Sequence, residues 1–416
     1  MTSPVDTSVK HYRNDMVGAP VLTGAAGSLI ALLDACLING FDSKTLTSLV
    51  ALAGVMTATF SGTHSATVDS VVLLAGVTGG PSGFAGANGE QKVTARPTAT
   101  TVSWATVLPD GTYTGTITMK MAPVPYWSKA FTGTNLAAYR STHPDSTGMY
   151  LYVDDTNTTV ARVVGYESMT AINAGVNAWP TTAIQSGGGY WVKSAAANTS
   201  PINWTLIADS RAFAFHCAPY QGNGVPTYNN MLGGATYFFG DFVSLRPGGN
   251  PWDCVLSFKY TPSTTDATLG DIASSVTWNN GICMPRPASG FGGANVCNAF
   301  PYQGTYASMS GLANINFYDK GALPTQSDGA IRLCKRYITM AGYVNMAPRG
   351  DVPGLWHCPQ YPIYDVLQHR SILPGSGALA GRNLIGIAAQ AVNNSIAVDT
   401  TNTGLAFWDI TGPWRN

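Results

Sequence analysis

Apolar and polar residues alternate in short runs along most of this chain, and glycine, proline and asparagine separate the runs. Alternation of this kind is typical of β-strands that bury one face. In the first third of the chain, strands are expected at residues 49–53, 55–60, 68–74, 91–94, 101–104 and 112–119. Strands so close together predict a compact β-domain over residues 45–122.

A second series of longer and more aromatic runs follows the proline-containing segment 121–127. MYLYVDD, ARVVGYE, YWVKS, INWTLIAD, AFAFHCAP, ATYFFGDFVSL and WDCVLSFKY each have the length of a strand. These runs predict a larger β-sandwich domain over residues 123–416, closed by the C-terminal runs RNLIGIAAQ, NSIAVDT and GLAFWDITGPW. Between about 261 and 330 such runs are few and Gly, Asn, Ser and Pro are frequent, so we expect a loop-rich insertion there.

Only the segment 25–38 has convincing helical periodicity. Leu29, Leu33, Cys36 and Leu37 fall on one face of a helix, and Asn39-Gly40 supplies a stop. Residues 1–24 show little periodicity and suggest an extended arm, so that residues 1–44 form an arm and a helix. This helix either packs on its own domain or docks on a neighbouring subunit.

The composition favours the same fold class, which is mainly β. Glutamate occurs only at Glu90 and Glu167, and lysine only nine times, although both residues suit exposed helix faces. The chain holds 46 Gly and 25 Pro, which suit turns. We therefore expect two β-sandwich or barrel-like domains, preceded by an N-terminal arm and one short helix.

The charges limit the choice of partners. Charged residues make up 11% of the chain, and 22 basic residues balance 22 acidic ones. This balance argues against nucleic-acid binding, which needs a basic excess. No apolar run approaches the roughly 20 residues of a membrane span. A poorly charged surface favours association, so we expect a homo-oligomer, with a polar extracellular protein as the alternative.

The N-terminal residues lack the apolar core of a signal peptide. The seven cysteines are odd in number and form no CxxC pair, which argues against a complete disulfide framework. Both observations suggest that the protein is made and folded in a reducing cytoplasm. Cys283 and Cys297, which bracket a Gly-rich loop, are the one pair considered for a disulfide.

The common catalytic motifs are missing from the sequence: no Lys follows a Gly, no Glu follows a His, and no GxSxG occurs. We therefore expect no enzyme activity and no cofactor. Polysaccharide cleavage by paired carboxylates stays open, because several acids are available and nothing selects among them. These acids are Asp154, Asp155, Glu167, Asp209 and Asp241.

Two motifs suggest metal ligands, and each has a simpler interpretation. His216-Cys217 and His357-Cys358 pair a nitrogen with a sulfur, but adjacent strand residues point to opposite faces, so buried thiols beside histidines are expected instead. Asp154-Asp155 offers oxygens for Ca²⁺, but the spacing is not that of an EF-hand, and a hairpin turn is expected. No metal site is therefore predicted.

Aromatic residues among small polar neighbours are typical of binding loops, and the irregular region is rich in them. They form either a surface for a sugar or a protein, or anchors that hold a long loop on the sandwich. The candidates are Trp278, Phe291, Phe300, Tyr302, Tyr306 and Tyr318.

Part of the chain resembles a small β-domain found in virion proteins of tailed bacteriophages, particularly tail and baseplate components. The resemblance rests on TATFSGTHSATVDSVVLLAGV, NGEQKVT and TTVSWATVLPDGTYTGTIT within residues 55–118. The later segments GMYLYVDDT, ARVVGYESM, GGGYWVKS, NWTLIADSRAFAF and FGDFVSLRPG also resemble phage virion proteins. Together these segments cover about half of the chain, and the family carries no catalytic residues to transfer.

The resemblance implies a structural protein of the virion, made in the bacterial cytoplasm and placed in the tail or baseplate. Its partners would be copies of itself and other tail or baseplate proteins. Two alternatives stay open: a tail protein that binds a host surface receptor, and a capsid decoration protein.

Overall fold

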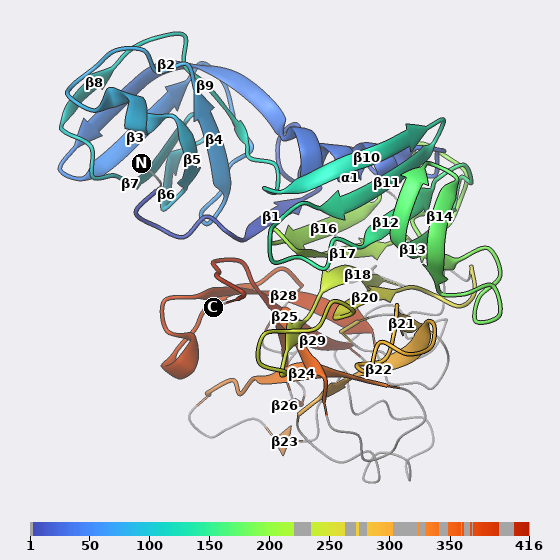
Figure 1. Cartoon of the computed structure of the whole chain (residues 1–416). Helices are drawn as coiled ribbons and strands as arrows, with labels where there is room; N and C mark the ends of the chain where they lie inside the picture. The colour runs from blue at the N-terminus through green and yellow to red at the C-terminus, as the bar shows by residue number, and fades with distance from the viewer. Residues whose placement is uncertain are drawn as a thin grey trace.

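The computed structural model describes residues 3–219, 234–262, 272–273, 281–302, 323–324, 329–340, 348–358, 360–361, 367, 369–390 and 403–415. Over these residues the chain is mainly β, with three antiparallel sheets and one short helix, which confirms the predicted fold class. Figure 1 shows the N-terminal sheet as a lobe beside the two other sheets. Within the described residues, no helix has the length and apolar character needed to cross a membrane.

The N-terminal sheet has eight strands in the order β5-β4-β9-β2-β3-β7-β6, with β8 paired to β2. Its strands are β2 Phe41–Leu52, β3 Val55–Phe60, β4 Val71–Ala75, β5 Gly89–Lys92, β6 Ala95–Thr98, β7 Thr101–Ala105, β8 Gly111–Tyr113 and β9 Thr118–Met121, and the short 3-10 helix η2 is Phe84–Ala87. A two-residue turn joins β2 to β3, with positive φ at Ala53 and Gly54, as hairpin turns of this length require. The boundary expected at residue 44 falls inside β2.

The second sheet has six strands in the order β10-β11-β12-β13-β14, with β15 paired to β13. Its strands are β10 Trp127–Gly133, β11 Leu136–Ser141, β12 Tyr150–Asp154, β13 Val160–Ala171, β14 Ala174–Trp179 and β15 Gly189–Val192. The segment between β9 and β10 is the proline-containing one that the sequence marks as a boundary.

The third sheet has thirteen strands in the order β1-β16-β17-β18-β20-β21-β22-β24-β25-β29-β28-β27, with β19 paired to β25. Its strands are β1 Lys10–Arg13, β16 Asn203–Ala208, β17 Ala212–Ala218, β18 Ala235–Asp241, β19 Val243–Ser244, β20 Cys254–Ser257, β21 Ile282–Met284, β22 Asn295–Pro301, β24 Cys334–Met340, β25 Gly350–His357, β27 Ile372–Pro374, β28 Asn383–Gln390 and β29 Thr403–Asp409. Two-residue strands β23 Leu323–Pro324 and β26 Gln360–Tyr361 pair in parallel, and η5 Gly377–Leu379 is a 3-10 helix. One apolar cluster holds side chains from strands along most of the large sheet, including Ile207, Phe238, Ile338 and Ile385, so the sheet curls around its own core.

Strand β17 separates two cores, because its side chains alternate between its faces. Ala212 and Ala214 belong to the core inside the large sheet, whereas Phe213 and Phe215 face the second sheet. There Trp191 lies 6.0 Å from Phe213 between ring centroids. Both faces of β16, β17 and β18 are therefore buried, which explains why their sequences are almost continuously apolar.

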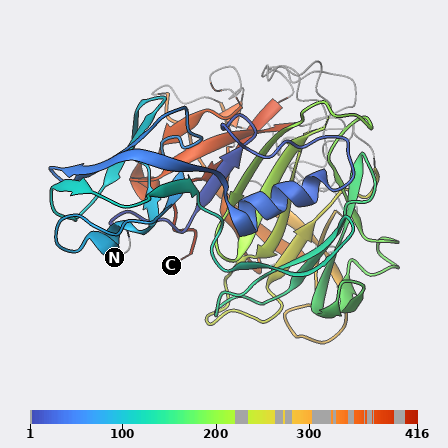
Figure 2. The same ribbon diagram turned by 90° about the horizontal axis from the view of Figure 1, so that it is seen from above.

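The predicted helix forms as α1 Ser28–Leu33, continued by the π-helical turn η1 Asp34–Asn39. Leu29, Leu33, Cys36 and Leu37 are all buried in the chain's own core, so the helix packs on its own domain. Figure 2 shows it lying across the strands of the large sheet.

The N-terminal segment differs from the extended arm expected there. Residues 10–13 form β1, an edge strand of the large sheet that pairs with β16. Tyr12 is fully buried, and its hydroxyl donates a hydrogen bond of 2.5 Å to the carbonyl of Ala122. A strand of four residues is too short to show periodicity in the sequence. Its pairing could not be predicted either, because its partner lies almost 200 residues away in the chain.

Part of the expected loop-rich insertion also differs from expectation. β21 and β22 lie within it and form the middle of the large sheet, where β21 joins β20 to β22. ICM and NVCNAFP are short and flanked by Pro, Gly and Asn, so their sequence pattern gave little sign of strands.

Candidate functional site

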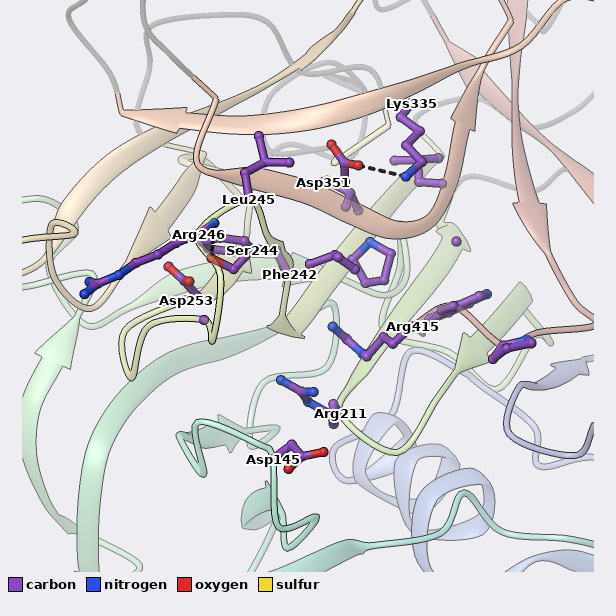
Figure 3. Close-up of a pocket in the computed structure, with 18 of the residues that line it drawn as sticks. Asp145, Arg211, Phe242, Ser244, Leu245, Arg246, Asp253, Lys335, Asp351 and Arg415 are labelled. Carbon is purple, nitrogen blue, oxygen red and sulfur yellow. Dashed lines mark hydrogen bonds and ion pairs between the residues drawn. The ribbon is translucent and has the colours of Figure 1, made fainter. Parts of the chain in front are cut away.

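A groove of about 960 Å³ opens beside the large sheet (Figure 3). Five separate parts of the chain line it: the turn at 145–147 after β11, the segment 242–253 around β19, the strand β25, residues 378–382, and the C-terminal residues 409–415. Arg211, in the turn between β16 and β17, and Lys335 of β24 complete the lining. A volume of this size accommodates a small ligand or a few units of a polymer.

This groove gathers charge in a chain that has little of it. Nine of its 29 lining residues are charged, whereas charged residues make up 11% of the chain. They are five bases, Arg211, Arg246, Lys335, Arg382 and Arg415, and four acids, Asp145, Asp253, Asp351 and Asp409. The groove is therefore strongly polar and nearly balanced in charge.

The acids lie deeper than the bases that pair with them. Asp241 is only 2% exposed, accepts hydrogen bonds from Thr147, and forms an ion pair of 3.1 Å with the half-buried Arg211. Arg415 pairs with the buried Asp209 at 2.7 Å and also donates to the carbonyl of Asp241. Since Asp209 and Asp241 are turned inward and the guanidinium groups lie above them, this part of the groove presents hydrogen-bond donors, whereas the carboxylate of Asp145 in the lining turn is 76% exposed.

The same arrangement recurs at the C-terminal end of the groove. Arg382 forms an ion pair with the buried Asp409 and donates to the carbonyl of Pro413 at 2.7 Å. Arg349, beside the groove, pairs with the buried Asp253. A guanidinium carries five N–H groups, and these contacts use only some of them.

On the opposite side, Asp351 receives two hydrogen bonds. The hydroxyl of Tyr302 donates to it at 2.8 Å, and Lys335 pairs with it at 2.9 Å. Burial raises the pKa of Tyr302, and the Asp351 carboxylate beside it adds to the rise, so the hydroxyl stays protonated as a donor. The ammonium of Lys335 also lies 5.9 Å from the ring centroid of Trp356. Figure 3 shows this side of the groove above Arg415 and Arg211.

Arg246 stands apart from the other bases. It lies in an exposed turn of the lining segment, followed by Pro247 and two glycines with positive φ, Gly248 and Gly249. Within the part of the chain that the structure describes, its guanidinium has no ion-pair partner. It is therefore the one lining base whose charge is not offset by a described carboxylate.

The aromatic residues predicted as a binding surface do not gather in one place. Phe300 and Tyr302 both contact Tyr337, with Tyr302 4.7 Å from it between ring centroids, so they border the groove at Asp351. Phe291 is 84% exposed in a separate loop, which a hydrogen bond from Asn250 to Ala288 joins to the groove-lining segment. Trp278, Tyr306 and Tyr318 lie outside the described residues.

The two aspartates considered for Ca²⁺ have structural partners. Asp154 accepts two hydrogen bonds from Thr156, which forms the expected turn. Asp155 is fully buried, pairs with the equally buried Lys193, and accepts hydrogen bonds from the backbone N–H groups of Leu29 and Ile30 at the start of α1. Burial raises the pKa of Asp155, and its attraction to Lys193 opposes the rise.

His216 and Cys217 show the opposed side chains that a strand imposes, and His357 and Cys358 are both buried. His216 contacts Thr236 at 3.1 Å, and its ring lies 5.3 Å from that of His369 between centroids, whereas the thiol of Cys217 points to the carbonyl of Lys193. Cys283 and Cys297 are buried free thiols. Among the described residues, no three His, Cys, Asp or Glu side chains cluster as metal ligands would.

Four of the five acids considered for polysaccharide cleavage are engaged in ion pairs, and the fifth, Asp154, accepts hydrogen bonds from Thr156. Glu167 receives both the Nε and Nη2 groups of Arg286, while Asp209 and Asp241 form the inner side of the groove. The sequence therefore named the buried acids that pair with two of the groove arginines, but it missed the arginines themselves. These come from distant segments and share no motif.

Comparison with known proteins adds no relative: no family model, no curated protein and no solved structure matches this chain.

Proposed function

We propose that this chain is a structural component of a tailed-bacteriophage virion, in the tail or baseplate, and that it has no catalytic activity. It would assemble with copies of itself and with neighbouring virion proteins. The resemblance of residues 55–118 to a virion β-domain supports this proposal. So does a composition that is poor in charge and balanced in sign, since such a surface favours association.

An apolar tip on the N-terminal sheet is the observation on which the proposal rests. Val50 and Leu52 of β2 and Val55 of β3 share one face, because Leu52 pairs with Val55 across the hairpin. Leu52 is 69% exposed, and Val107, which follows β7, is exposed beside the turn. Contiguous exposed apolar side chains typically mark an interaction surface. Val55 and Val107 of this tip lie in the segment that resembles the virion domain, and Val50 and Leu52 precede it directly.

Replacing Leu52 and Val55 together with serine is expected to weaken self-association of the purified full-length chain. Both side chains are exposed, so the change removes apolar contact area at an interface while it costs the fold little, within about 0.5 kcal/mol per site. Light scattering coupled to size-exclusion chromatography measures the mass of the complex, and thermal unfolding checks the fold.

The matched control is Val176→Ser, which alters an exposed valine on β14 of the second sheet and is expected to leave the mass unchanged. A wild-type chain that stays monomeric at high concentration, and is absent from purified particles by mass spectrometry, would overturn the proposal. The same mass spectrometry gives the copy number, which separates a tail ring from the many copies of a capsid decoration protein.

The groove favours a second candidate function, a tail protein that binds a host surface receptor. Its donors face outward, and the exposed Phe291 lies in the adjoining loop. Host-range mutations that map to residues 242–253 or 285–294 would support this function. Host-range mutations confined to another gene would count against it.

A further inference from the structure

We propose that the groove binds an acidic glycan, through carboxylate groups of the sugar that accept hydrogen bonds from Arg211 and Arg246. This inference extends the receptor-binding candidate function. It rests on that function only for the biological source of the glycan.

The unused donors of the groove point to a ligand rich in acceptors. Arg211 pairs with Asp241 through Nε, and its two terminal nitrogens donate to no described residue. Arg246 has no described side-chain partner at all. A guanidinium recognises a carboxylate with two parallel N–H···O bonds, and such charge-assisted bonds are about twice as strong as neutral ones.

Because buried acids offset the charge of the groove bases, the groove favours ligands with single, separated hydrogen-bond acceptors. Each of Arg211, Arg382 and Arg415 has a carboxylate partner behind it, so its charge is largely offset before any ligand arrives. A long polyanion such as nucleic acid gains its affinity from a basic excess, which the groove lacks. A sugar chain that carries carboxylates at intervals matches the separated guanidinium groups better than a long polyanion does.

The rest of the lining offers flat apolar surfaces between the polar groups. Trp356 is half-buried and Trp414 is mostly buried, and both contribute to the lining together with Pro247, Pro251 and Pro353. Apolar walls with a few placed polar groups are typical of small-ligand sites, and the C–H faces of sugars suit such walls.

An extended peptide fits this groove less well. Peptides that bind sheets usually add a strand at a free edge. β25, the strand that lines the groove, pairs with β24, β29 and β19 at its two ends, and residues 352–354 between them belong to no ladder among the described residues. Pro353 has no N–H group and Gly354 has a positive φ of 70°, so these residues do not form the regular edge that a peptide strand needs.

Calorimetric titration of the full-length protein tests the inference with three probes: oligogalacturonate, hyaluronan oligosaccharides, which carry glucuronate, and oligomers of N-acetylneuraminate. At least one is expected to bind with an affinity that falls on methyl esterification of its carboxylates. Arg246→Gln is expected to weaken that binding about tenfold, the loss of one charge-assisted bond. Because Arg246 is exposed, the variant should unfold at the wild-type temperature.

Arg96→Gln is the matched control, since Arg96 is exposed on β6 of the N-terminal sheet, remote from the groove. Absence of binding by all three probes would overturn the inference. Equal binding of a probe and its methyl ester, or an unchanged affinity in Arg246→Gln, would do so too. Whether the protein occurs in particles is measured separately, so this inference and the virion proposal fail independently.

Discussion

Replacing Asp155 with alanine is expected to lower the free energy of unfolding by about 3–5 kcal/mol. The change leaves the ammonium of Lys193 fully buried without its carboxylate. It also removes the acceptor for the backbone N–H groups of Leu29 and Ile30, which open helix α1. Urea unfolding at neutral pH measures the loss.

The expected loss of stability comes from one buried charge, that of Lys193, left without its carboxylate. Lys193 keeps a hydrogen bond to the carbonyl of Ala25 at 2.6 Å, but burial already lowers its pKa, and Asp155 is the attraction that opposes this shift. The double variant Asp155→Asn with Lys193→Met removes both charges together. Replacement of a buried ion pair by neutral groups is often nearly neutral in energy, so it should recover much of the stability.

Asp154→Ala is the matched control for the buried aspartate. Asp154 neighbours Asp155, but it bonds only to Thr156 in an exposed turn, so its loss is expected to cost about 1 kcal/mol or less. If Asp155→Ala were no more destabilising than Asp154→Ala, the buried pair would have no part in tying the N-terminal helix to the second sheet.

This pair also shows how far the sequence predicts the fold. The helix 25–38 was predictable because its apolar face repeats within a few residues. That this helix packs on its own chain was not predictable, because the Asp155 carboxylate that caps it lies more than 100 residues further along the chain. Nor was β1, a strand of four residues whose register is set by β16. Local periodicity identifies an element, whereas its partner depends on topology.

The candidate site was predictable only in part, for the same reason. Tyr302 stood out as an aromatic residue among small polar neighbours, and the structure places it beside the groove. Asp209 and Asp241 were among five acids considered for polysaccharide cleavage, and nothing in the sequence selected them. The arginines above them were not predictable, since Arg211, Arg382 and Arg415 come from separate segments that only the curled sheet brings together.

Mild acid is expected to unfold this protein, because four of its histidines are buried in the neutral state. Burial lowers the pKa of His11 and of His216 to about 3, and it lowers the pKa of His357 and His369 well below the usual value. The charged neighbours that contribute most are arginines and lysines, which lower these pKa values further. Protonation of any of the four therefore opposes the fold.

The sign of the pH dependence follows from the two states. Between pH 6.5 and 3 the unfolded chain binds a proton at His11 and at His216 and the folded chain does not, so stability falls as the pH falls. Each pH unit below 6.5 costs about 1.4 kcal/mol per histidine. At pH 5, His11 and His216 together remove about 4 kcal/mol, and His357 and His369 act in the same direction. A total stability of about 5–15 kcal/mol is typical, so the loss is large.

Histidine variants test this pH dependence more sharply than the pH at which the wild-type protein is half unfolded. Burial raises the pKa of Asp69 and Asp155, and their protonation favours the folded state, so these acids oppose part of the loss. Combining His11→Leu with His216→Gln removes two titrating sites and should flatten the curve of stability against pH by nearly 3 kcal/mol per unit between about pH 6 and 5. The matched control is His143→Gln, in a turn near the surface, and it should leave the slope as it was. If the double variant keeps the wild-type slope, the prediction is wrong. The two histidines would then be neutral in the unfolded chain or protonated in the folded chain, whereas their burial among arginines and lysines predicts the opposite.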